Sequence, residues 1–194
     1  MSIGIVACGA IALEIETIQR DHSLDITIYP LPPLLHNSPK KIPSEVDQLL
    51  TRMKDLHEKR AVAYADCGTY GALDEILDRH GVPRLSGNHC YDVYLGKKKF
   101  DEMVSEQPGT YFLTDFLVKS FNRSVIIEMG LDRYPELHDD YFKNYERVVW
   151  LAQNRTPELE RLAHECANQL ALPLEIVEVG LSGLALEILN FAKN

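Results

Sequence analysis

The chain has 194 residues, a net charge of −9 and a pI of about 5.2, and 45% of its residues are hydrophobic. This acidic surface repels phosphate and argues against nucleic acid as a partner, since the only short basic run is Lys97-Lys98-Lys99, which we expect to be a solvated turn. No apolar run approaches the roughly 20 residues that cross a bilayer, and the first residues lack the basic segment of a signal peptide, so we expect a cytoplasmic protein with no membrane partner.

In the first half of the chain, short apolar runs alternate with helical patterns. Strands are expected at 3–7, 25–29, 60–64 and 82–85. Helices are expected at 10–20, 44–57 and 70–80, with Ser44 as an N-cap and Gly81 ending the third helix.

The second half repeats this alternation. Strands are expected at 109–113, 147–152 and 174–179, and helices at 116–121, 156–170 and 183–192. No element is assigned to 126–145, and this segment is expected to be either a lid or an excursion of the chain that packs on the domain. Strands separated by helices imply crossover connections. The expected fold is therefore a single α/β domain, 1–194, with a mostly parallel sheet flanked by helices, arranged in two similar lobes, 1–108 and 109–194.

A cysteine or a histidine follows each of the first four expected strands. In chain order these residues are Cys8, His36, Cys67 and Cys90. The carboxyl ends of parallel strands open on one side of a sheet, where ligands bind. The sequence therefore predicts a functional site there, although packing in the core is the alternative for any one cysteine.

These residue types are typical of a metal site. A tight turn through glycine after Cys8 and after Cys67 places each sulfur at a helix start, which favours the thiolate. Zinc favours tetrahedral cysteine and histidine ligands. We expect Cys8, Cys67 and Cys90 as ligands, with His36 or His89 as the fourth. His36 is favoured, because His89 adjoins Cys90 and neighbouring residues rarely face one ion.

Three further residues are candidates for catalysis. Asp66 is expected to orient a ligating histidine, and His89 to line the pocket. Asp115 is expected either to face the same cleft or to begin a helix together with Thr114. Cys166 lies on the apolar face of a helix and is expected to be structural. The other histidines, His22, His57, His80, His138 and His164, are expected at the surface.

Several motifs resemble those of an uncharacterised family, that of domain of unknown function 1638. The resemblance rests on segments 7–9, 35–37, 64–68, 87–91, 113–116 and 141–145. It covers nearly the whole chain. It implies a supporting role beside corrinoid-dependent methyl transfer in one-carbon metabolism, with corrinoid methyltransferase proteins as partners.

The leading hypothesis is a zinc-dependent enzyme, a transferase or a hydrolase, or a metal-carrying accessory protein with a small-molecule substrate. The ion would activate a bound water, thiol or substrate as a Lewis acid. Three alternatives stay open. They are a three-cysteine iron–sulfur cluster, a module that carries metal or corrinoid for a partner, and a thiol enzyme with Cys67 or Cys90 as nucleophile and His36 or His89 as base.

Overall fold

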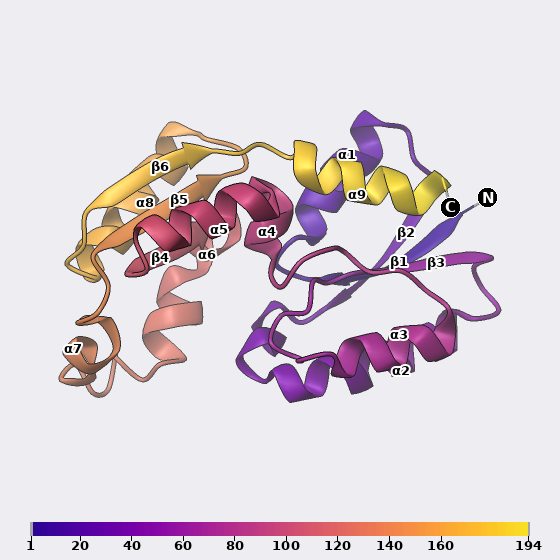
Figure 1. The fold of residues 1–194 in the computed structure, drawn as a ribbon, viewed down its shortest axis with the longest axis horizontal. Helices are drawn as coiled ribbons and strands as arrows, with labels where there is room; N and C mark the ends of the chain where they lie inside the picture. The colour runs from indigo at the N-terminus through magenta and orange to yellow at the C-terminus, as the bar shows by residue number, and fades with distance from the viewer. Residues whose placement is uncertain (1, 194) are drawn as a thin grey trace. The chain divides into compact units, whose positions relative to one another are not determined.

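The computed structural model describes residues 2–193, which form two compact units (Figure 1). Residues 2–93 and 181–193 form the first unit, and 94–180 the second. Each unit has a three-stranded parallel sheet flanked by helices, with strand order β2-β1-β3 in the first and β4-β5-β6 in the second. The expected α/β class is confirmed. The two units differ from the expected lobes, because the last helix belongs to the first unit.

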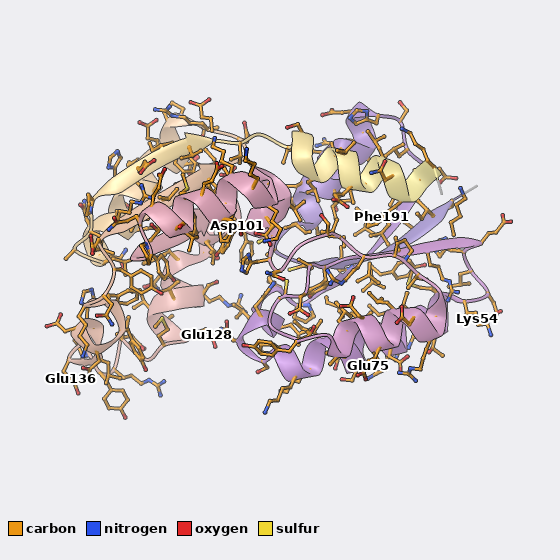
Figure 2. All side chains as sticks on the ribbon, viewed as in Figure 1. Lys54, Glu75, Asp101, Glu128, Glu136 and Phe191 are labelled. Atoms are coloured by element: carbon orange, nitrogen blue, oxygen red, sulfur yellow. The ribbon has the colours of Figure 1, made fainter. Side chains whose placement is uncertain are left out.

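In the first unit the central strand is buried along its whole length. It pairs with a strand on each side, and helices cover both faces of the sheet, α1 and α9 over one and α2 and α3 over the other (Figure 1). Phe191 of α9 is buried on the side facing the strands, whereas Glu75 of α3 is exposed (Figure 2). The elements are β1 (Ile3–Cys8), α1 (Ala12–Asp21), β2 (Ile26–Leu31), α2 (Ile42–Met53), β3 (Lys59–Ala63), α3 (Ala72–His80) and α9 (Ser182–Lys193).

In the second unit the core lies between the sheet and the helices α6 and α8. Leu113 and Trp150 point to this face, and the ring of Phe112, on the opposite face, lies 5.1 Å from that of Phe100 in α5. The elements are α5 (Lys97–Glu106), β4 (Thr110–Thr114), α6 (Asp115–Phe121), a π-helical segment (Asn122–Ile127), α7 (Leu137–Phe142), β5 (Arg147–Ala152), α8 (Pro157–Gln169) and β6 (Leu174–Glu178). The chain passes between the units through α4 (Cys90–Leu95) and after β6.

Two expected elements differ from the structure. The run 82–85 is no full strand but a single parallel bridge, Val62 to Arg84, because Pro83 has no N–H to continue a ladder. Helix α2 begins at Ile42, with Pro43 in its first turn, so Ser44 is not its N-cap. The Ser44 hydroxyl instead donates back to the carbonyl of Lys41 at 3.0 Å.

The expected turn at 97–99 is also wrong, since it begins helix α5. Among the histidines placed at the surface, His57 is only 9% exposed. Its Nε2 lies 2.7 Å from the hydroxyl of Tyr29, which supplies the partner that a buried imidazole needs. In the part of the chain that the structure describes, no helix is long and apolar enough to span a membrane.

Candidate metal site

The candidate site lies at the carboxyl end of the first sheet. Cys8 is the last residue of β1 and is paired with Leu31 of β2. On the other side Ala7 pairs with Ala63, the last residue of β3, so the next step along both strands sets Tyr64 beside Cys8. Side chains in register on parallel strands point to the same face. The Cys8 sulfur and the Tyr64 ring therefore share one face of the sheet.

His36 reaches this point from a short 3₁₀ helix, Pro33–Asn37, that follows β2. The backbone of Gly9 approaches that of Leu31 closely, and its N–H donates to the Leu31 carbonyl at 2.9 Å. Glycine permits this approach, because a Cβ would lie 2.5 Å from that oxygen. The Cys8 sulfur lies 3.7 Å from His36 Nδ1 and 4.0 Å from Nε2. Nδ1 also lies 3.0 Å from the carbonyl of Pro33, a bond that leaves Nε2 for a ligand.

Cys67 is presented by a tight loop that Asp66 organises. The Asp66 carboxylate accepts four hydrogen bonds from this loop, from Thr69 Oγ1 at 2.8 Å and from the N–H groups of Gly68, Tyr70 and Gly71 at 3.0–3.2 Å. Burial raises the pKa of the Asp66 carboxyl, but these bonds outweigh burial and hold that pKa below its usual value. Cys67 itself has a φ of 51°, a left-handed backbone conformation that a residue other than glycine adopts only when its surroundings impose it.

The loop before Cys90 is joined to the Cys67 loop by two backbone bonds. Asp66 N–H donates to Gly87 at 3.2 Å, and Cys67 N–H donates to Asn88 at 2.7 Å. Cys90 is then the first residue of α4. These bonds bring the segments that carry Cys67 and Cys90 together, as the first sheet brings together those that carry Cys8 and His36.

The electrostatics of the four side chains are coupled. Burial opposes a charge on His36, but hydrogen bonds and charges from Cys67 and Cys8 outweigh burial and raise the pKa of His36 to about 11. Burial raises the pKa of the Cys90 thiol well above its usual value, and the charges of Cys67 and Cys8 raise it further. Anionic sulfur here therefore needs a cation beside it. A proton on His36 is one such cation and a metal ion is another.

The spacing of Cys8 and His36 is close to that of two ligands of one ion. Tetrahedral zinc with bonds of about 2.3 Å to sulfur and about 2.05 Å to nitrogen sets the two ligand atoms about 3.6 Å apart. The observed separation is 4.0 Å from the Cys8 sulfur to Nε2, the nitrogen left for a ligand, and 3.7 Å to Nδ1. Among residues 2–193, however, no three histidine, cysteine, aspartate or glutamate side chains lie where they could hold one metal ion. An ion would have to draw the sulfurs inward.

Comparison with known proteins identifies the family. The model of a protein family of unknown function, DUF1638, matches residues 30–186. The chain belongs to this family. None of the curated proteins matches it.

Among solved structures, this DUF1638 protein is similar to the glutamate racemase from Aquifex pyrophilus. The two are 18% identical with a TM-score of 0.51, over 98% of this chain and 84% of the racemase chain. At this identity the likeness concerns the fold alone, two α/β units with parallel sheets.

The imidazole of His89 lies beside a carboxylate that sequence reasoning missed. The buried carboxylate of Asp92 lies 3.4 Å from His89 Nδ1 and accepts a bond from the Asn88 N–H at 2.6 Å. Gly87 leaves room for this carboxylate, since a Cβ there would lie 2.7 Å from it. An acidic residue three positions after a histidine at a helix start is the signal that points to such a pair. The expected catalytic role of His89 stays a prediction.

Asp115 lies in the second unit and is 2% exposed. Its carboxylate accepts bonds from Trp150 Nε1 at 2.9 Å, from Gln153 N–H at 3.1 Å and from Asn154 N–H at 2.8 Å. Thr114 is the N-cap of α6 and accepts from the N–H of Leu117. These contacts favour a structural role for Asp115, in which it ties β4, α6 and the end of β5 together.

Proposed function

We propose that this DUF1638 protein is a cytoplasmic metal-binding protein whose ion is held by Cys8, His36, Cys67 and Cys90. Zinc is the first choice of ion. One observation carries the proposal: the segments that carry the four side chains meet at the carboxyl end of one sheet, where the Cys8 sulfur lies 4.0 Å from His36 Nε2, the ring nitrogen left for a ligand. Soft sulfur combined with imidazole suits zinc.

The geometry favours His36 over His89 as the fourth ligand. His36 interacts with both Cys8 and Cys67, and its Nδ1 bond to the Pro33 carbonyl is the orienting contact that ligating histidines commonly make. The imidazole of His89 instead lies beside Asp92, with Nδ1 3.4 Å from its carboxylate. Asp66 supports the site by fixing the loop of Cys67, which is a positioning role.

The charges of the proposed ligands limit which reactions the bound ion could promote. Three thiolates and a neutral imidazole on a divalent ion give the site a net charge of −1, whereas the ions that activate water most strongly have neutral ligands. An electron-rich site of this kind is a poor activator of water, and its sulfur remains nucleophilic. The proposed role is therefore group transfer to or from a small molecule, or metal carriage for a partner, rather than hydrolysis.

Within that role, a link to corrinoid-dependent methyl transfer is the specific form that we propose. It rests on the family resemblance and on the suitability of a nucleophilic sulfur for accepting a methyl group. Corrinoid methyltransferase proteins are the partners that this form implies.

Metal analysis of anaerobically purified protein tests the proposal. We expect about one zinc per chain in a colourless protein, and a cobalt-substituted form with the absorption of a four-coordinate ion and sulfur-to-cobalt charge transfer. A brown protein containing iron and sulfide would replace the proposal with an iron–sulfur cluster. A metal-free protein that takes up no zinc or cobalt, with one rapidly alkylated cysteine, would replace it with a thiol enzyme.

A further inference from the structure

The side chain of Tyr64 ends beside the candidate site. Tyr64 follows β3 directly, is set beside Cys8 by the register of β1 and β3, and is 1% exposed. Its ring stacks on that of His36, with centroids 5.8 Å apart and an angle of 30° between the planes. The hydroxyl lies against Cys8, yet it makes no hydrogen bond of ordinary geometry with any residue between 2 and 193.

A buried hydroxyl without a partner destabilises a fold, because its bonds to water are lost on folding. Phenylalanine would fill the same space and stack on the same imidazole without that cost. The half-buried Tyr29 of this unit obeys the usual rule, since its hydroxyl lies 2.7 Å from His57 Nε2. We therefore expect the Tyr64 hydroxyl to gain a hydrogen-bond partner when a ligand binds.

We infer that Tyr64 is a positioning residue of the proposed metal site and that its O–H donates a hydrogen bond to the Cys8 sulfur once that sulfur is a metal-bound thiolate. A neutral thiol is a weak acceptor, whereas a thiolate is a strong one. The Ala10 N–H already donates to this sulfur at 3.4 Å, so the thiolate would have two donors. The inference rests on the proposed function.

The donor would have two consequences for the loaded site. It would draw negative charge from Cys8, which eases the crowding of three thiolates around one ion. It would also hold the Cys8 side chain in one rotamer, with the ring fixed against His36. Both effects concern the metal-bound form and leave the metal-free protein unchanged.

The test compares Tyr64→Phe with the wild type and with Tyr29→Phe as a matched control that loses a formed bond on the same sheet. Metal-free Tyr64→Phe is expected to melt at or above the wild-type temperature, whereas metal-free Tyr29→Phe melts lower. Zinc affinity, measured by competition with a chelator, is expected to fall about tenfold or more in Tyr64→Phe only. The sulfur-to-cobalt charge-transfer band should shift to lower energy in that variant, since the thiolate loses a donor.

Tyr64→Phe with wild-type zinc affinity and an unchanged charge-transfer band would overturn the inference and leave the metal site standing. A Tyr64→Phe variant that is destabilised in the metal-free state by as much as Tyr29→Phe would also overturn it, because the hydroxyl would then have a partner without metal. Wild-type protein that takes up neither cobalt nor zinc would instead overturn the proposed function, and the inference with it.

Discussion

Cys67→Ser is expected to lower the zinc content of the purified protein at least about tenfold, since changes one step removed from a metal already cost that much. The sulfur of Cys67 interacts with His36, and its loop is fixed by Asp66 and by the bond from its own N–H to Asn88. Serine retains the volume and the backbone, and its hydroxyl is a poor ligand for zinc at neutral pH. The loss therefore reports on ligation rather than on folding.

Cys166→Ser is the matched control. Cys166 is buried in α8, its thiol lies 3.7 Å from the carbonyl of Val118, and burial raises its pKa to about 12. It belongs to the second unit, and the four proposed ligands belong to the first. Zinc content should be unchanged in Cys166→Ser, and native Cys166 should resist alkylation even when chelator exposes the other cysteines. Full zinc content in Cys67→Ser would remove Cys67 from the site.

Asp115→Asn is expected to lower the free energy of unfolding of the second unit by about 3 kcal/mol. The carboxylate accepts three bonds, two from the buried residues Trp150 and Gln153 and one from the backbone of the exposed Asn154. Asparagine turns an amino group toward one of these donors. One donor then loses its acceptor, and the others lose a charged one.

Urea unfolding followed by tryptophan fluorescence measures this loss. Trp150 is the only tryptophan, is fully buried, and contacts Asp115 directly, so it reports on the second unit. Asp139→Asn is the control, because the Asp139 side chain is 95% exposed, and a change within about 0.5 kcal/mol is expected. An Asp115→Asn variant as stable as this control would show that the three bonds contribute nothing to the free energy of unfolding. It would favour the alternative hypothesis, that Asp115 has a catalytic role.

Hydrophobic periodicity was enough to predict the strands and most helices, but it predicted one mostly parallel sheet where the structure has two. Arg147–Ala152 was predicted to the residue, and Gly81 ends α3 in the left-handed conformation expected of it. Helix α5 was missed because three lysines open it and Phe100 is its only buried residue, which leaves no apolar period to detect. The burial of His57 depends on Tyr29, 28 residues away, and no local pattern encodes it.

The candidate site was predictable to a similar depth. Strand ends identified Cys8 and Cys67, because parallel strands deliver their last residues to one edge. Tyr64 and Asp92 were missed, since their significance lies in what they face: a stacked imidazole beside a sulfur for Tyr64, and the ring of His89 for Asp92. The preference for His36 over His89 came from the sequence, because His89 adjoins Cys90. The contact of His36 Nδ1 with the Pro33 carbonyl, which carries no signature in the sequence, adds to that preference.

X-ray absorption at the zinc edge of the zinc-loaded protein tests the central claim most directly, because it counts the ligand atoms around the ion. The proposed site predicts three sulfurs at about 2.3 Å and one imidazole nitrogen at about 2.0–2.1 Å. The imidazole signal should vanish in His36→Ala and persist in His89→Ala. A shell of nitrogen and oxygen alone, or one with fewer than three sulfurs, would contradict the assignment of Cys8, Cys67 and Cys90 as ligands of one ion.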